Sequence, residues 1–364
     1  MNKKILIIGS TGKLGSKLLS YSYNADISIY AITCFSNKKK LINQTKKFNI
    51  NKSFVLSILS EKKKFLKFIS KTKFSIIYFL DYGSSSLIFL DKILKNNSGA
   101  TIAIANKEMI IAGGHLFKDQ FTQSNNNLVP LDSEHFSLFR LNPNDSETKS
   151  LYITASGGPF YFNKGINLKS VSQKEVISHP KWKMGINNSI DSSNFINKIL
   201  EIFELSIIFN INISKIDFLI SKEAYIHSLI CFRDNTISIN CFENDMLIPL
   251  IKPLTHKFKS NDLNIKSKKY LDFTNLKIEK FNDKRFKIFK YLKEIKKFSH
   301  NQQISFMILN NYAHINYLNG KLRYSKIIDF IFDKIEPQKD MKFTTFHDIL
   351  QYIDKLKSKY ENFK

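Results

Sequence analysis

Two acidic residues that could bind a metal follow Pro130, in the run LDSEH at 131–135. Side chains two residues apart point the same way from an extended chain, so Asp132 and Glu134 would present two carboxylates side by side. Hard oxygen ligands of this kind suit Mg²⁺ or Mn²⁺. An acidic pair at an exposed strand end is also common, so the pair by itself leaves both interpretations open.

A second candidate site is a polar stripe in the apolar run IDSSNFINKILEIFE at 190–204. The run predicts a helix capped by Ser192 or the serine after it, and Asn197, Glu201 and Glu204, at i, i+4 and i+7, share one face of that helix. Most other side chains of the run are apolar, so a buried stripe would cost several kcal/mol without partners. A metal at Glu201 would supply one partner, and structural salt bridges are the alternative. A phosphate at the helix start would bind Ser192, Asn197 and Lys198.

Two further stretches could bind a phosphate or cover a ligand. The run TASGGPF at 154–160 places the Ser156 hydroxyl beside two glycines, whose backbone N–H groups can approach an anion closely. The run SHPKWKMG at 178–185 carries His179, the single tryptophan Trp182, and Gly185. Such a loop is typical of a mobile lid over a ligand. A surface loop pinned by one buried aromatic side chain is an equal alternative.

A third glycine-containing turn predicts a dinucleotide site. Gly9, Gly12 and Gly15 are three of only 12 glycines in 364 residues. They follow the apolar run 4–8, which is typical of a buried parallel strand, and precede leucines at helical spacing. A strand, a glycine turn and a helix form the start of a Rossmann unit, where a pyrophosphate binds at the helix N-terminus. The spacing is G-x-x-G-x-x-G, so a bare structural turn stays possible.

The elements around that turn predict the sheet and the form of the cofactor. A second strand at 27–33 is followed by Asn37 and three lysines at 38–40 instead of an acidic residue, which favours the 2′-phosphate of NADPH. A solvated lysine run is the alternative. Strands at 75–80 and 101–105 alternate with helices near 60–70 and 86–95, the rhythm of a doubly wound α/β sheet.

Taken together, these stretches resemble the 1-deoxy-D-xylulose 5-phosphate reductoisomerase family, whose members use NADPH and a divalent metal. Coverage is nearly the full chain, dense from 100 to 250 and thin after 276. The matching runs are GSTGKLG at 9–15, IANKE at 104–108, PLDSEH at 130–135, TASGGPF at 154–160, HPKWKMG at 179–185, IDSSNFINKILEIFE at 190–204, IHS at 226–228, DMLIPL at 245–250 and LDFTNL at 271–276.

The resemblance implies a role for each matching residue. Metal ligands would be Asp132, Glu134 and Glu201. The substrate phosphate and backbone would be held by Ser156, His179, Ser192, Asn197 and Lys198, and its hydroxyls by Ser133 and the catalytic Lys107, under a loop carrying Trp182 and Met184. Cofactor contacts would come from Gly9, Ser10, Thr11, Gly12, Leu14, Asn37, Asn106, Glu108 and Gly185, with Asn106 and Glu108 on the nicotinamide side.

The resemblance also implies an activity and an organisation. The family rearranges 1-deoxy-D-xylulose 5-phosphate and reduces the resulting aldehyde with NADPH, giving 2-C-methyl-D-erythritol 4-phosphate for isoprenoid synthesis. The expected fold is α/β, with an NADPH-binding Rossmann-like domain at 1–130, a catalytic domain at 131–252, a linker at 253–283 and a helical domain at 284–364. A homodimer joined through the catalytic sheet is expected from the resemblance alone.

Composition excludes several other classes of protein. Hydrophobic residues make up 43% and charged residues 24%, as in a globular protein. No apolar run reaches the ~18 residues of a membrane span, and the strand-like run at 4–8 leaves no room for a leader. Three cysteines without metal spacing fit a reducing cytoplasm.

The net charge of +25 comes mostly from lysines scattered outside a near-neutral middle segment, without a nucleic-acid-binding motif. We therefore expect no nucleic-acid partner. A diverged NADPH oxidoreductase acting on another phosphorylated sugar and a catalytically silent basic binding protein are the alternative functions.

Overall fold

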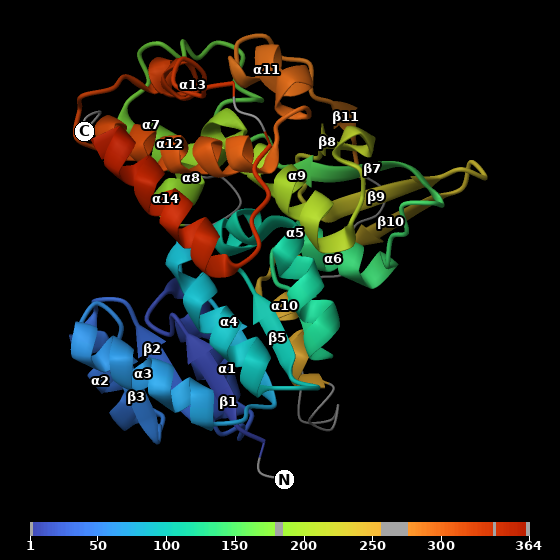
Figure 1. Ribbon diagram of the computed structural model, residues 1–364. Helices are drawn as coiled ribbons and strands as arrows, with labels where there is room; N and C mark the ends of the chain where they lie inside the picture. Colours follow the sequence, from blue (N-terminus) through green and yellow to red (C-terminus); the bar gives the residue numbers. More distant parts are fainter. Residues whose placement is uncertain (1–2, 179–184, 256–275, 338–339, 362–364) are drawn as a thin grey trace. The chain divides into compact units, whose positions relative to one another are not determined.

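The computed structural model describes residues 3–178, 185–255, 276–337 and 340–361. The chain forms two compact units, one from Met1–Phe139 with Asp245–Tyr270 and the other from Arg140–Asn244 with Leu271–Lys364. Figure 1 shows the elements of both in sequence colours. Each unit is described by itself below.

The first unit is built on a parallel sheet in the order β3-β2-β1-β4-β5-β6. Every residue of the central strands β1 and β4 is buried, which explains their unbroken apolar sequences. The α/β prediction is confirmed, and so is its doubly wound rhythm. The strands are β1 Ile5–Ile8, β2 Ala31–Cys34, β3 Lys52–Val55, β4 Ile76–Phe79, β5 Thr101–Ile104 and β6 Asn127–Pro130.

The helices of the first unit pack against one another beside this sheet. Helices α3, α4 and α5 pack in a row, and α1 packs against α10, which also contacts β5. The Tyr78 hydroxyl of β4 donates to the Leu250 carbonyl of α10 at 2.9 Å. The helices are α1 Lys13–Asn24, α2 Lys38–Lys47, α3 Leu59–Lys71, α4 Leu87–Asn96, α5 Lys107–Ser124, α6 Ser133–Leu141 and α10 Leu247–Thr255, with a 3-10 turn at Ser84–Ser86.

The compact units differ from the predicted domain boundaries at 130 and 252. The described segment after Asp245 belongs with the first unit, because the apolar face of α10 joins the same core as Ile5, Ile7 and Tyr78. Helix α6 runs across the unit boundary after Phe139. The residues that make these contacts are far apart in the sequence, so local composition could not predict the boundaries.

The second unit is built on a mixed sheet in the order β10-β9-β7-β8-β11. Strand β7 pairs parallel with β8 and antiparallel with β9. The strands are β7 Thr148–Ala155, β8 Ile216–Ile220, β9 Ile226–Phe232, β10 Ile237–Cys241 and β11 Glu279–Lys280. The helices are α7 Gln173–Ile177, α8 Ile186–Asn194, α9 Ile196–Phe209, α11 Ile288–Ile295, α12 His300–Leu318, α13 Ile327–Phe332 and α14 Phe346–Tyr360, with 3-10 turns at Ile213–Lys215 and Tyr324–Lys326.

The predicted C-terminal helices pack within this second unit. Helix α12 contacts α13, α14 and α8. Its Asn310 amide and His314 ring each lie 2.9 Å from the buried Asp191 carboxylate of α8. The helical tail therefore supports the helix that carries Ser192. Among the described residues, no helix is long and apolar enough to cross a membrane.

Candidate functional site

The first glycine turn is a close-packed connection between β1 and α1. Gly9 has a φ of +91°, and a Cβ there would lie 2.5 Å from the Asp81 nitrogen. A Cβ on Gly15 would lie 2.5 Å from the Gly9 carbonyl oxygen. Backbone therefore occupies the space of both side chains, so only glycine fits. Gly12 is the N-cap of α1 and is exposed, which leaves the helix N-terminus open to an anion.

Ser10 fastens this turn to the sheet. Its side chain is fully buried, and its hydroxyl lies 2.8 Å from the Gln44 amide oxygen on α2. The Ser10 backbone N–H donates to the Thr33 carbonyl at 2.8 Å, and the Gln44 amide returns a bond to the Ser10 carbonyl at 2.9 Å. Its donors hold the turn in this way, and the cofactor contact expected of Ser10 stays a prediction.

The predicted lysine run begins α2 beside the turn. Asn37 is the N-cap, with its side-chain oxygen accepting from the Lys40 N–H at 3.1 Å. The Lys40 ammonium donates to the Thr11 carbonyl at 2.8 Å, so the run is tied to the glycine turn. Lys38 and Lys39 are exposed on the first turn of α2. Cations and a helix N-terminus together offer an anion a favourable place.

Asn106 and Asp81 join the ends of two neighbouring strands. The Asn106 side chain caps α5 by accepting from the Met109 N–H at 2.9 Å, and it donates to Asp81 at 3.2 Å and to the Gly83 carbonyl at 3.0 Å. The Ser86 hydroxyl also donates to Asp81. Burial raises the pKa of Asp81 to about 6, although both hydrogen bonds lower it. The Asn106 amide is thus engaged within the protein.

The first turn of α5 carries two buried charged residues. Lys107 and Glu108 are only 6% and 5% exposed. The Lys107 ammonium lies 3.5 Å from the Asp132 carboxylate, at the end of the neighbouring strand β6. This contact orients Asp132 and offsets its charge.

The acidic pair is held by a helix instead of a strand. Asp132 directly precedes α6, and Glu134 lies in the first turn of that helix. The expectation of an extended chain is therefore wrong, because the chain turns into α6 immediately after β6. The Ser133 hydroxyl donates to the Glu134 carboxylate at 2.5 Å, and both residues are buried. Carboxylates in a first helical turn are stabilised by the helix dipole.

In the second unit, the polar stripe lies on α9 as predicted. The Lys198 ammonium lies 2.7 Å from the Glu201 carboxylate, which also accepts from the Asn197 amide. Lys198, Glu201 and Glu204 are buried. The stripe therefore has charged partners within its own helix, and the buried carboxylates stay usable as ligands.

The capping prediction at Ser192 is wrong. Ser192 and Ser193 lie inside α8, and α9 starts after Phe195, which joins the two helices in the left-handed conformation with φ 68° and ψ 8°. Phe195 is buried, with its ring centroid 4.5 Å from that of Phe281 and 4.8 Å from that of Phe286. Aromatic packing holds this joint where a serine cap was expected.

The Ser-Gly-Gly turn after β7 is confirmed as a turn and abuts the end of α8. Gly157 and Gly158 have φ values of +87° and +57°, and a Cβ on Gly158 would lie 2.8 Å from the Ser192 carbonyl oxygen. Ser156, Ser192 and Asn197 stay partly exposed within otherwise buried segments. Three predicted phosphate ligands are therefore accessible side chains on elements of one compact unit.

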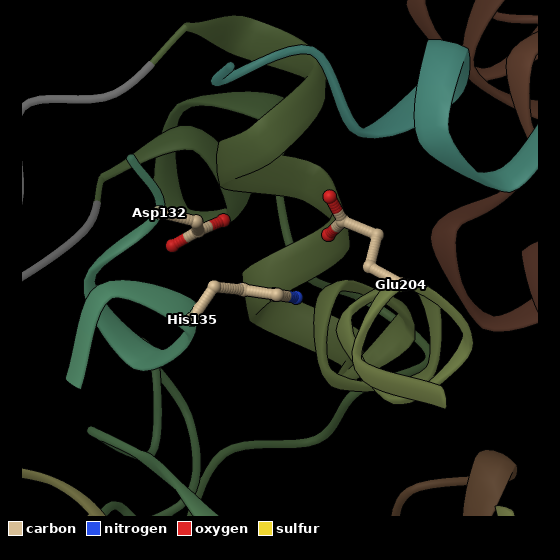
Figure 2. Close-up of side chains that lie close together, drawn as sticks. All are labelled: Asp132, His135 and Glu204. Atoms are coloured by element: carbon tan, nitrogen blue, oxygen red, sulfur yellow. The ribbon is translucent and has the colours of Figure 1, made fainter. Parts of the chain in front are cut away.

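The structure also gathers carboxylates into groups that could hold a metal ion. One ligand atom from each of Asp132, Glu134 and Glu201 lies within 4.8 Å of the others. A second group with the same spacing is Asp132, His135 and Glu204, whose side chains lie close together in Figure 2. Three carboxylates form the all-oxygen donor set that Mg²⁺ and Mn²⁺ prefer. The predicted ligand set therefore fits such an ion.

Known proteins with similar sequences carry the name of one enzyme family. A family model described as the 1-deoxy-D-xylulose 5-phosphate reductoisomerase C-terminal domain matches residues 128–209. A 1-deoxy-D-xylulose 5-phosphate reductoisomerase of Pelagibacter ubique is 30% identical, over 96% of this chain and 97% of the relative. The chain belongs to the 1-deoxy-D-xylulose 5-phosphate reductoisomerase family.

Solved structures of reductoisomerases share the fold. The enzyme from Zymomonas mobilis in complex with NADPH superposes with a TM-score of 0.81 at 22% identity, covering 98% of each chain. A reductoisomerase in complex with NADPH, fosmidomycin and magnesium gives a TM-score of 0.84 at 22% identity, covering 99% of this chain and 98% of the other. The fold predicted from the resemblance is confirmed over nearly the full length.

Two residues near Asp132, a histidine and a glutamate, were not predicted as site residues from the sequence. His135 and Glu204 are both buried and share a group with Asp132. The sequence did contain a signal for each: His135 follows Glu134 directly, and Glu204 lies one helical turn after Glu201. The predicted His179, Trp182 and Met184 lie outside the described residues, whereas Gly185 is the exposed N-cap of α8.

Proposed function

We propose that this protein catalyses the NADPH- and divalent-metal-dependent conversion of 1-deoxy-D-xylulose 5-phosphate to 2-C-methyl-D-erythritol 4-phosphate. The observation that carries the proposal is the group of Asp132, Glu134 and Glu201 in a full-length member of the family. The reductoisomerase names of the relatives support the reaction, and they do not favour an unrelated sugar or a catalytically silent protein.

The acidic group is the proposed binding place for Mg²⁺ or Mn²⁺. Asp132, Glu134 and Glu201 would hold the ion, which supplies a Lewis acid for the substrate ketone and its neighbouring hydroxyl. Lys107 orients Asp132 from 3.5 Å, and Ser133 orients Glu134 from 2.5 Å. Lys107 and Ser133 are also the proposed partners of the substrate hydroxyls, because buried donors exclude water and fix the reacting groups.

The phosphate of the substrate would bind in the second unit. Ser156 and Ser192 are partly exposed and carry hydroxyls, and Asn197, one helical turn before Glu201, carries an amide that donates to the Glu201 carboxylate. Lys198 adds a buried positive charge. Anchoring the phosphate away from the reacting carbons lets binding energy orient the substrate. Roles for His179 and Trp182 on the adjoining segment are proposed from the resemblance alone.

The turn between β1 and α1 is the proposed NADPH site. Gly9, Gly12 and Leu14 with Thr11 would receive the pyrophosphate at the N-terminus of α1, and Asn37 with the lysines after it would receive the 2′-phosphate. The cofactor supplies the hydride. Asn106, Glu108 and Gly185 stay proposed neighbours of its nicotinamide half. Equal turnover with NADH and NADPH would contradict the role of the lysines.

The central experiment measures NADPH consumption with 1-deoxy-D-xylulose 5-phosphate, with and without Mn²⁺. We expect Glu201→Gln to lower kcat/KM by at least about 100-fold, because a neutral amide is a poor ligand and removes the ion pair between Glu201 and Lys198. The matched control is Glu294→Gln on the exposed surface of α11. Turnover without metal, or an active Glu201→Gln variant, would refute the site.

A homodimer and a cytoplasmic location are also proposed. Strand β10 lies at the edge of its sheet and exposes Ile237 and Ile239 by 61% and 48%. Exposed apolar side chains on a strand at the edge of the described sheet favour pairing with another chain. All three cysteines are free, which fits a reducing compartment. Light scattering should give twice the mass of one chain. The Ile239→Lys variant should give a lower mass, closer to that of one chain, because a charge replaces an apolar side chain on the edge strand.

A further inference from the structure

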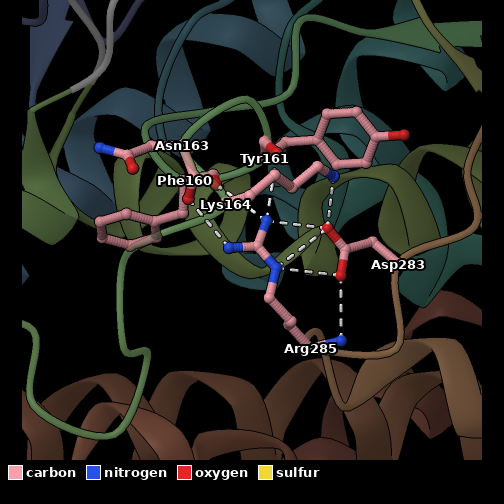
Figure 3. A network of polar contacts seen from close by, with 6 residues as sticks. All are labelled: Phe160, Tyr161, Asn163, Lys164, Asp283 and Arg285. Atoms are coloured by element: carbon pink, nitrogen blue, oxygen red, sulfur yellow. Dashed lines mark hydrogen bonds and ion pairs between the residues drawn. The ribbon is translucent and has the colours of Figure 1, made fainter.

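A charged network in the second unit fastens the segment that follows the Ser-Gly-Gly turn. The Arg285 guanidinium donates to the carbonyls of Phe160 at 3.3 Å, Tyr161 at 3.1 Å and Asn163 at 2.9 Å. Figure 3 shows these bonds converging on one side chain. The guanidinium has five N–H donors in a rigid plane, enough to bond three carbonyls and a carboxylate together, whereas an ammonium has only three.

Asp283 holds the guanidinium in place. Its carboxylate lies 2.8 Å from Nη2 and within 3.2 Å of Nε of Arg285, and 2.8 Å from the Lys164 ammonium. Asp283 is 6% exposed. The hydrogen bonds from Arg285 keep the pKa of Asp283 far below its ordinary value, despite burial. The pair therefore stays charged at neutral pH and rigid.

The fastened segment leads directly to the phosphate turn. The Tyr161 N–H donates to the Gly157 carbonyl at 3.2 Å, while its carbonyl accepts from Arg285. Gly158 lies against the Ser192 carbonyl, where a Cβ would come within 2.8 Å. Arg285 thus acts on the turn through one residue, and the turn acts on the end of α8.

We propose that Arg285 is a positioning residue for the substrate phosphate, which sets the distance between Ser156 on the turn and Ser192 on α8. The inference rests on the proposed function, and it deepens it by naming what fixes the phosphate site. Arg285 does not touch the substrate. Its loss releases the three carbonyls and lets the turn move away from α8.

The test compares Arg285→Met and Arg285→Lys with the exposed control Arg323→Met. We expect Arg285→Met to raise the KM for 1-deoxy-D-xylulose 5-phosphate by about 10-fold, since several charge-assisted bonds are lost. Arg285→Lys should give a smaller rise, because lysine keeps the charge but loses the fork. The KM for NADPH should change less than about twofold in every variant.

A second readout separates positioning from general destabilisation. Inorganic phosphate should compete with substrate for the wild type and about 10-fold more weakly for Arg285→Met, while turnover of unphosphorylated 1-deoxy-D-xylulose should be equal in both. Equal loss on both substrates, or an unchanged phosphate inhibition constant, would overturn the proposal.

Phosphate binding also keeps this test separate from the proposed reaction. A wild type that binds inorganic phosphate by calorimetry but does not turn over the sugar phosphate would refute the reaction alone. Equal phosphate binding by the wild type and both Arg285 variants would refute the positioning role alone. If Arg285→Met fails to fold, the same comparison is made with Arg285→Lys, where unchanged phosphate binding and substrate KM would overturn the proposal.

Discussion

The glycine turns of the two units are both proposed to bind an anion, and they are held in place by different contacts. The turn at 9–15 is held by packed backbone, by the bonds between Ser10 and Gln44, and by the Lys40 ammonium, which donates to the Thr11 carbonyl. The turn at Ser156 is held from outside by the Arg285–Asp283 ion pair. Backbone packed around Gly9 and Gly15 leaves the first turn little freedom to move, whereas the second depends on a charged side chain that one substitution can remove. Rigidity of an anion site can thus come from shape or from charge.

The carboxylates beside the turns differ in the same way. Burial raises the pKa of Asp81, whose N–H lies against Gly9, to about 6, whereas Arg285 lowers that of Asp283. A lowered pKa stabilises the fold above the ordinary range near 3.8, and this stability is lost as the pH falls below it. A raised pKa acts in the opposite sense. The two supports therefore respond to pH with opposite signs.

The largest expected effect comes from filling the first turn. Gly15→Ala would place a Cβ within 2.7 Å of three backbone atoms of Gly9 and Ser10. Since backbone cannot give way cheaply, we expect NADPH to bind about 100-fold more weakly, equivalent to about 3 kcal/mol. Fluorescence titration measures the NADPH affinity, with Gly165→Ala as control, where a Cβ would lie 3.8 Å from its nearest neighbour. Unchanged NADPH binding would show that the shape of the first turn does not determine its affinity for the cofactor.

A smaller effect is expected from filling the second turn. Gly158→Ala places a Cβ 2.8 Å from the Ser192 carbonyl at a left-handed φ of +57°. Because Arg285 holds this turn only through Tyr161, we expect a smaller effect than at Gly15: about a 10-fold rise in the KM for the sugar phosphate and an unchanged KM for NADPH. Gly165→Ala, with 3.8 Å to its nearest neighbour, is the matched control. A parallel rise in both constants would show that the two turns are not independent.

The smallest effect concerns the pH dependence of stability. In the unfolded chain Asp81 loses its proton near pH 3.8, whereas in the folded chain it does so near 6, so the free energy of unfolding falls as the pH rises through this window. We expect Asp81→Asn to be more stable than the wild type above pH 7, by about 1–2 kcal/mol after allowance for partial exposure. At pH 4 the difference should vanish. Denaturant unfolding at pH 4 and above pH 7 measures the difference in the free energy of unfolding, with Asp91→Asn as control. The same difference at both pH values would contradict the raised pKa of Asp81.

Much of the fold could be read from local patterns. The apolar runs at 4–8, 75–80 and 101–105 predict β1, β4 and β5 to within about a residue, because buried parallel strands need unbroken apolar sequence. The second strand was placed too early. Ile27 and Ile29 are buried like strand residues, yet regular pairing with β1 begins at Ala31.

The site was predicted in composition better than in conformation. The acids and the turn residues could be named because few residue types suit metal and phosphate. Nothing in the local pattern showed that Asp132 and Glu134 lie at a helix start. That Phe195 caps α9 depends on packing with Phe281, far along the chain. The same holds for Asp81, Gln44 and Arg285, whose supporting roles come from partners at least twenty residues away. Periodicity carries no information on such pairs.

The left-handed joint at Phe195 would fix the distance between the proposed phosphate site and the proposed metal site, and with it the length of the substrate that fits. One buried residue connects the helix of Ser192, a proposed phosphate ligand, to the helix of Glu201, a proposed metal ligand, so neither helix can slide along the other. We expect sugar phosphates one carbon longer or shorter to lose kcat more than affinity, because their anion still docks while their ketone misses the acids. Comparable kcat values for these shorter and longer sugar phosphates would show that the joint does not fix this distance.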